Sequence, residues 1–301
     1  MVKIALTGAT GFIGRYIVQH LADQGHSCRC WFRPNSDRSN FKNWEDRLEW
    51  VCAELNDGNE ASFVEGCDAV VHSALHHPGG GYRGGQGDLV EFVDRNVVGS
   101  LRLIEAARAA SVRRFIFISS CAVHERILDD RPLDEKHPLW STSHYGAHKA
   151  AIEKFVHSYG FGHGYPICAL RPTGVYGIAR PIEHTKWFNL VQTVVRGESV
   201  TCQRGGKEVH AADVAKAVGV LLISDGITGE AYNCYDRYVS EWDVATLAKE
   251  LSKSGSEILG HQTRSKHQIE TSKLRALGMA FGGDELLRQT IQRLVNAVRG
   301  I

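Results

Sequence analysis

The chain has 301 residues, of which 43% are hydrophobic and 23% charged, which is typical of a folded globular protein with a sizeable core. Its net charge is +1 without a basic stripe, and no apolar run approaches the roughly 18–20 residues that span a bilayer, so we expect neither nucleic acid nor a membrane as a partner. The eight cysteines are scattered through apolar runs, and the first predicted strand begins at Val2 without room for a signal peptide, so we expect a reduced, cytoplasmic protein.

The first predicted element is a short apolar strand that ends in a turn with three glycines, Gly8, Gly11 and Gly14. A helical pattern follows, with Ile17 and Leu21 on one face. Glycines at such a turn allow the backbone to approach a pyrophosphate at the N-terminus of the helix. The spacing of three differs from the commonest dinucleotide fingerprint, and a glycine turn after a single strand is as often structural as functional.

Strand-like and helix-like segments then alternate through the first half of the chain. Further strands are predicted at 28–32, 48–51, 68–72, 114–119 and 166–170, and helices at 89–110 and 144–159. Nearly continuous apolar strands with helices between them predict an α/β fold, a doubly wound parallel (Rossmann) sheet covered on both faces. We expect residues 1–170 to form a dinucleotide-binding domain, and the less regular residues 171–301 to be mainly a substrate-binding domain whose strand near 231–235 returns to the sheet.

The glycine-rich segment 78–87 follows the fourth predicted strand, at the edge of the sheet where open α/β sheets bind ligands. A lid over the site and a tolerated surface insertion both explain its composition.

Tyr145 and Lys149 lie four residues apart in the predicted helix 144–159, so they share one helical face. A free tyrosine is a poor acid–base catalyst at neutral pH, but a nearby ammonium and a cationic nicotinamide ring favour its phenolate. Ser120 follows a predicted buried strand, which places a hydroxyl at the carboxyl edge of the sheet. The strand end, the helix and the glycine turn would all open onto one crevice.

In these motifs the sequence resembles the extended short-chain dehydrogenase/reductase family, which includes the NAD-dependent epimerases and dehydratases. The resemblance spans nearly the whole chain and rests on eight segments: residues 7–14, 68–74, Asn96 with Gly99, Ser119-Ser120, Tyr145 to Lys149, 171–177, 210–215 and 272–278.

The resemblance implies specific roles. Tyr145 would be the general acid/base, Lys149 would bind the nicotinamide ribose and tune Tyr145, Ser120 would polarise the reacting oxygen, and Asn96 would be a structural or relay residue. The cofactor would be held by Gly8, Gly11, Phe12, Ile13, Gly14, Glu54, Leu55, Ala74, Tyr145, Lys149 and Pro172. Family dimers pair through the helices expected here at 89–110 and 144–159, so a homodimer is expected.

The end of the second strand bears on the choice of cofactor. NAD binders place an acidic residue there for the ribose hydroxyls, whereas an arginine accommodates the 2′-phosphate of NADP. Here Arg33 ends the strand and Ser36 could add a hydroxyl donor, which favours NADP. Asp37 could instead reach the ribose, so NAD remains possible.

The chain also departs from the family pattern. His124 replaces an aromatic residue near the pocket, where it could contact substrate or simply pack, and Ala53-Glu54-Leu55 replaces the usual Gly-Asp-Leu. The motif 171–177 lacks the asparagine common in sugar-nucleotide epimerases. His76 and His77 have no third ligand at a recognisable spacing, so no metal is expected.

These observations favour an NAD(P)-dependent oxidoreductase acting on a small alcohol or carbonyl compound. An epimerase or dehydratase that retains its cofactor is the alternative, and a non-catalytic NADP-binding sensor is a third. Specificity would lie in the second half, where Trp187, Phe188 and the region of Pro181 are candidate pocket residues.

Overall fold

The computed structural model describes residues 1–79 and 87–301, which form two compact units. The first unit comprises residues 1–172, 214–234 and 269–279, and the second comprises 173–213, 235–268 and 280–301. Most of the glycine-rich segment predicted as a lid or insertion lies outside the described residues.

A seven-stranded sheet with parallel pairing throughout forms the centre of the first unit. Its spatial order is β10-β6-β5-β4-β1-β2-β3, and its strands are β1 (Lys3–Thr7), β2 (Ser27–Phe32), β3 (Leu48–Cys52), β4 (Ala69–His72), β5 (Arg114–Ile118), β6 (Ile167–Pro172) and β10 (Ala231–Cys234). The strand order reverses between β1 and β4, which is the topological switch point at which open α/β sheets bind their ligands. The predicted doubly wound parallel sheet is confirmed.

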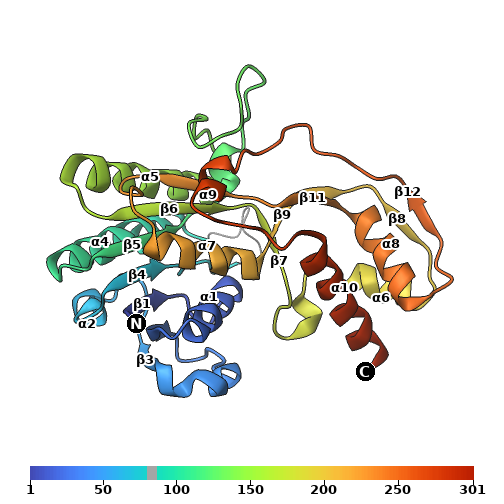
Figure 1. The fold of residues 1–301 in the computed structure, drawn as a ribbon, viewed down its shortest axis with the longest axis horizontal. Coiled ribbons are helices and arrows are strands. Elements are labelled where there is room, and N and C mark those ends of the chain that lie inside the picture. Colours follow the sequence, from blue (N-terminus) through green and yellow to red (C-terminus); the bar gives the residue numbers. More distant parts are fainter. Residues whose placement is uncertain (80–86) are drawn as a thin grey trace. The chain divides into compact units, whose positions relative to one another are not determined.

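Helices cover both faces of this sheet (Figure 1). Their bounds are α1 (Phe12–Asp23), α2 (Glu60–Val64), α3 (Leu89–Val93), α4 (Gly99–Ala109), α5 (His144–His157), α7 (Ala211–Ile223) and α9 (Ser272–Ala276). Side chains of α2, α4 and α5 share an apolar core with one face of the sheet, including Phe63, Leu103 and Ile152. The helices α1 and α7 lie side by side, because a Cβ added at Gly219 would touch the ring of His20.

The helix predicted at 89–110 is divided in the structure. A π-helical turn, Asp94–Val98, separates α3 from α4, and a second one, Ser158–Gly162, follows α5. The spacing of hydrophobic residues shows which face of a helix is buried, but it does not reveal an inserted residue. The predicted helical range is therefore right, but the π-helical turn within it was not predicted.

The second unit contains short strands and three helices of eight or more residues among those described. Its strands are β7 (Gly174–Tyr176), β8 (Val200–Cys202), β9 (Gly205–His210), β11 (Arg237–Ser240) and β12 (Ile258–Gly260), and its helices are α6 (Phe188–Val195), α8 (Glu241–Ser252) and α10 (Gly283–Arg299). The strands pair as β11-β9-β7 and β12-β8. Apolar side chains of α6, α8 and α10, such as Val191, Val244 and Ile291, form a separate core.

Candidate active site

The glycine turn between β1 and α1 has a geometry that requires glycine at two of its three positions. Gly8 has φ +73°, and a Cβ there would lie 2.8 Å from the backbone nitrogen of Ala74. A Cβ at Gly14 would overlap the carbonyl oxygen of Gly8. The N-cap of α1 is Gly11, no side chain caps this end, and its first turn has no acidic residue. This leaves the positive end of α1, with Phe12 and Ile13 as its first residues, suited to a phosphate group.

A buried network of hydrogen bonds links the ends of β1 and β4. The hydroxyl of Thr7 accepts from the backbone N–H groups of the two residues after His72, both at 3.1 Å, so its own proton goes to His72 Nδ1 at 2.7 Å. His72 Nε2 then donates to the hydroxyl of Ser100 at 2.7 Å, and that hydroxyl donates to the carbonyl of Asn96. Burial, aided by the positive charge of Lys149, lowers the pKa of His72 to about 3, so the ring is neutral. No sequence pattern indicates this network, because its members are far apart along the chain.

Asn96, predicted as a structural or relay residue, is buried with its amide fully engaged. Its Oδ1 accepts from the backbone of His76 at 2.8 Å, and its Nδ2 donates to the carbonyls of His76 and Phe92, each at 2.9 Å. The side chain therefore fixes the segment that leaves β4, which includes Ala74 beside Gly8.

Tyr145 and Lys149 project from the first two turns of α5. The N-cap of α5 is Ser143, whose hydroxyl accepts from the backbone N–H of Gly146 and donates to Glu125. Tyr145 is half-buried, whereas Lys149 is buried and its Nζ donates to the carbonyl of Ile118 at 2.7 Å. Burial lowers the pKa of Lys149 to about 7, against the opposing effect of Glu153.

Ser120 lies two residues beyond that carbonyl, at the carboxyl end of β5. Its backbone is extended and its Oγ accepts from the backbone of Ala122 at 3.1 Å, which fixes the side chain at the start of a short 3₁₀ turn. One sheet edge thus provides Ser120 and the carbonyl that anchors Lys149.

A buried ion pair lies beneath these residues. Glu153, one turn after Lys149, and Arg171 on β6 are almost completely inaccessible and make a salt bridge of 2.5 Å. Ser119 donates its hydroxyl to Glu153. The sequence analysis did not predict this ion pair. Two signals were present: Glu153 lies on the same helical face as Lys149, and Arg171 is the first residue of the motif 171–177.

His124 belongs to the same network as this ion pair. Because a guanidinium can only donate, His124 Nε2 accepts from Arg171 at 3.1 Å, and Nδ1 donates to the carbonyl of Pro138 at 3.3 Å. Burial, then the charge of Arg171, lowers the pKa of His124 to about 3. Both ring nitrogens are therefore used in packing, which favours the packing alternative over substrate contact.

The end of β2 gathers residues that bear on the cofactor. Arg33 is exposed, and its backbone N–H donates to the hydroxyl of Ser36 at 3.0 Å. Asp37 Oδ1 accepts from the backbone and hydroxyl of Ser39, at 2.9 and 2.7 Å, and Arg15 donates to the carbonyl of Asp37 at 2.7 Å. The Asp37 carboxylate thus stabilises its own turn.

The remaining predicted cofactor residues lie at other strand ends. Glu54 and Leu55 both follow β3. Glu54 is exposed, and its Oε2 lies 3.6 Å from Nη1 of Arg95, whereas Leu55 is buried. Pro172 is buried as the last residue of β6. Among the described residues, no group of three or more His, Cys, Asp or Glu side chains is placed to hold a metal ion.

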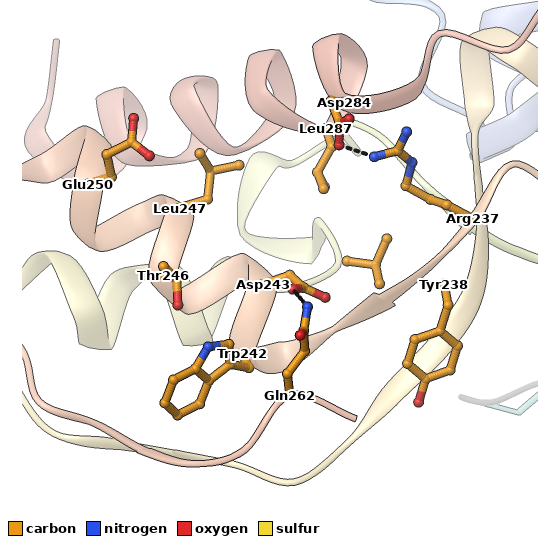
Figure 2. Close-up of a pocket in the computed structure, with 11 residues that line it drawn as sticks. Arg237, Tyr238, Trp242, Asp243, Thr246, Leu247, Glu250, Gln262, Asp284 and Leu287 are labelled. Atoms are coloured by element: carbon orange, nitrogen blue, oxygen red, sulfur yellow. Dashed lines mark hydrogen bonds and ion pairs between the residues drawn. The ribbon is translucent and has the colours of Figure 1, made fainter. Parts of the chain in front are cut away.

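A pocket of about 470 Å³ lies in the second unit, between β11, α8 and α10. Figure 2 shows two pairs of polar side chains in this pocket, Arg237 with Asp284 and Gln262 with Asp243. None of the predicted site residues lines it, and neither do Trp187 and Phe188.

The sequence profile of the NAD dependent epimerase/dehydratase family matches residues 4–234. The chain belongs to this family. The predicted kinship is therefore confirmed, and with it the prediction of a nicotinamide-dependent enzyme.

Two curated relatives illustrate the breadth of the epimerase/dehydratase family. The dTDP-D-glucose 4,6-dehydratase of Mus musculus is 29% identical over 296 residues, covering 89% of this chain and 76% of that protein. A protein of Synechocystis, provisionally named as a dihydroflavonol 4-reductase, is 31% identical over 154 residues, or 51% of this chain and only 40% of that protein.

Solved structures of epimerases confirm the fold. A UDP-glucuronic acid 4-epimerase from Bacillus cereus, in complex with UDP-glucuronic acid and NAD, matches with a TM-score of 0.80 at 20% identity, over 99% of both chains. The UDP-glucose 4-epimerase of Thermus thermophilus, in complex with NAD, gives 0.77 at 24% identity, also over 99% of both chains. Within the described part of this chain, no helix is both long and apolar enough to cross a membrane.

Proposed function

We propose that this chain is an NADP-dependent oxidoreductase that transfers a hydride between nicotinamide and a small alcohol or carbonyl compound. Tyr145 is the general acid/base, Lys149 its cationic neighbour, and Ser120 the hydroxyl that orients the reacting oxygen. The observation that carries the proposal is the hydrogen bond from Lys149 Nζ to Ile118, because it ties the helix bearing Tyr145 to the strand end bearing Ser120.

The residues of the first unit fit a dinucleotide. A Cβ at Gly8 or Gly14 would fill the cradle at the N-terminus of α1, so the glycines keep that space open for a pyrophosphate. In the proposed complex Ala74 lines the cofactor beside Gly8, Glu54 and Leu55 lie near the adenine, and Pro172 lies near the nicotinamide.

NADP is proposed over NAD from the end of β2. Arg33 is exposed and its guanidinium suits a 2′-phosphate, with Ser36 as a second donor. Asp37, the acidic residue that could accept from the ribose hydroxyls, is held by Ser39 and Arg15 in its own turn.

In the proposed mechanism the bound nicotinamide supplies or accepts the hydride. Ser120 donates a hydrogen bond to the carbonyl oxygen of the substrate and orients it. Tyr145 Oη transfers a proton to that oxygen during reduction and removes it during oxidation. Lys149 favours the phenolate of Tyr145 by its charge and binds the nicotinamide ribose. Asn96 acts as a positioning residue, since its amide is engaged with backbone groups.

An epimerase or dehydratase that returns the hydride to the substrate is the second candidate. It is favoured by the relatedness to dTDP-D-glucose 4,6-dehydratase over 89% of the chain. The absence of the asparagine from residues 171–177 argues against a nucleotide-sugar substrate. A cofactor-binding sensor is disfavoured by the presence of both Tyr145 and Lys149.

Absorbance at the nicotinamide band tests the proposal. Small alcohols, aldehydes, ketones and nucleotide sugars are incubated with each cofactor, and Tyr145→Phe serves as the matched variant. We expect a net absorbance change with NADP(H) and a carbonyl or alcohol, lost by a factor of at least about 10² in Tyr145→Phe while cofactor binding is kept. Product formation without absorbance change would favour the epimerase instead, and full activity in Tyr145→Phe would refute the assigned acid/base.

We also propose that the second unit binds the substrate and that the chain forms a homodimer. Support for the dimer comes from exposed apolar side chains on the helices that pair in the family: Leu89, Val90 and Val93 on α3 and Phe155 on α5. Sedimentation of the wild type and of Val90→Glu tests it, since a charge on the interface should yield monomers.

A further inference from the structure

Glu208 on β9 is buried in the second unit with half of its carboxylate unsatisfied. The residue is 3% exposed, and its Oε1 accepts a hydrogen bond from Lys186 Nζ. Its Oε2 has no hydrogen-bond partner among the described residues. A buried acceptor without a donor destabilises the protein, so an additional donor would stabilise this site.

Two glycines make room for this carboxylate. Gly174 is directly opposite Glu208 in the β7–β9 pairing, and a Cβ there would lie 2.8 Å from Oε2. A Cβ at Gly206 would overlap Oε1. Gly174 is itself exposed, and it follows Pro172, the last residue of β6, by two positions. The carboxylate thus lies directly behind accessible backbone at the start of the second unit.

Tyr176 adds a second unsatisfied polar atom on the same face of this small sheet. The residue is fully buried, its ring lies 5.0 Å from that of His210, and its hydroxyl has no partner among the described residues. Burial raises the pKa of Tyr176, and nearby carboxylates, including Asp236 and Glu208, raise it further. The hydroxyl therefore remains protonated and can donate.

The charges around this face do not suit a diphosphate. The ammonium of Lys186 is neutralised by Glu208. Arg237 is opposite Glu208 in the register of β11 with β9, and its guanidinium forms ion pairs with Asp236 and Asp284. The charge of Arg293 acts on His210 and not on Glu208, so an anion placed at Glu208 would meet a buried carboxylate whose cation, Lys186, is already paired.

We infer that Glu208, with Lys186 and Tyr176, selects an uncharged, hydroxyl-bearing substrate and rejects one that carries a diphosphate. A substrate hydroxyl would donate to Glu208 Oε2, and a second substrate oxygen would accept from Tyr176. The inference rests on the proposed function, because it assigns substrate recognition to the second unit.

The binding of UDP to the NADP⁺-saturated protein, measured by calorimetry, tests the rejection of diphosphates. We expect wild type to bind UDP at least tenfold more weakly than Glu208→Gln, because the amide leaves the charge of Lys186 unneutralised. Adding Lys186→Met to Glu208→Gln should abolish the gain. Equal affinities in wild type and Glu208→Gln, including no binding to either, would overturn the inference; Glu208→Ala replaces Glu208→Gln if the latter does not fold.

Reduction of glyceraldehyde and of glyceraldehyde 3-phosphate with NADPH tests the acceptance of neutral substrates. We expect a higher kcat/KM for the uncharged aldehyde, with the preference reduced at least tenfold in Glu208→Gln through KM. A preference of wild type for the phosphorylated aldehyde would contradict the inference. If neither aldehyde nor any other carbonyl is reduced, the proposed oxidoreductase function fails, whereas the UDP measurement still decides the role of Glu208.

Discussion

Replacing Glu153 by glutamine should destabilise the protein strongly. Glu153 and Arg171 are fully buried, and the carboxylate accepts from Arg171 Nε at 3.0 Å, from Arg171 Nη2 at 2.5 Å and from the hydroxyl of Ser119. Glutamine keeps one oxygen, but its amide N–H groups would face the N–H groups of the Arg171 guanidinium. The guanidinium would then be a buried positive charge without a counter-ion. Breaking such a pair costs about 3–5 kcal/mol.

Thermal and denaturant unfolding followed by circular dichroism measures this cost. For a domain of this size, about 3–5 kcal/mol corresponds to a decrease in Tm of roughly 6–20 °C. The double variant Glu153→Gln/Arg171→Met removes both charges and should recover most of the loss, because neutral groups of similar volume tolerate burial. A change below about 1 kcal/mol in Glu153→Gln, or a double variant less stable than the single one, would refute the reasoning.

The same substitution should alter the pH dependence of turnover. Burial lowers the pKa of Lys149 to about 7, and the negative charge of Glu153 opposes that effect. Without this charge the pKa of Lys149 falls further, so the ammonium that favours the Tyr145 phenolate is lost at a lower pH. We expect the alkaline limb of the kcat profile for Glu153→Gln to shift to lower pH, whereas a purely structural role would leave it unchanged.

Three further predictions concern the cofactor site and acid stability. Gly14→Ala should abolish NADP binding or folding, because the added Cβ overlaps the Gly8 carbonyl; Gly255→Ala, where a Cβ meets no atom within 4 Å and φ is not positive, is the control. Arg33→Ala should weaken NADPH at least tenfold and leave NADH unchanged by titration; equal losses would exclude a phosphate contact. Burial lowers the pKa of four histidines to between about 2 and about 4: His72, His124, His148 and His210. The unfolded state therefore binds more protons below pH 6.5, and the free energy of unfolding should fall by about 5 kcal/mol between pH 6 and pH 5, as urea titration would reveal. A flat profile would contradict this.

The fold was predictable because apolar runs determine strands in a fully covered sheet. The predicted strand at 28–32 is β2 (Ser27–Phe32) in the structure, and the predicted strand at 114–119 is β5 (Arg114–Ile118). The small strands of the second unit were not predicted, since three-residue strands such as β7 and β8 are too short to show a hydrophobic period.

The candidate site was predictable only where residues follow one another at a fixed spacing. Tyr145 and Lys149 share a helical face, and Gly8 and Gly14 share a turn, so the sequence itself places them. The partners of Lys149 are different, because Ile118 is 31 positions away and is brought close by the pairing of strands. Glu208 and Gly174 likewise meet only through the register of β7 with β9.

Buried polar groups with and without hydrogen-bond partners have different consequences for function. In the first unit, His72, Asn96 and Arg171 each have hydrogen-bond partners on every side-chain group described here, so they hold the strand ends and α5 in fixed positions. Other buried groups keep an atom without a partner among the described residues: His148 in the first unit, and Glu208 and Tyr176 in the second. Groups whose partners come from the protein determine geometry, whereas groups that lack a partner gain most from a ligand. For this reason we seek the specificity of this chain at Glu208, whose free oxygen lies behind the exposed backbone of Gly174.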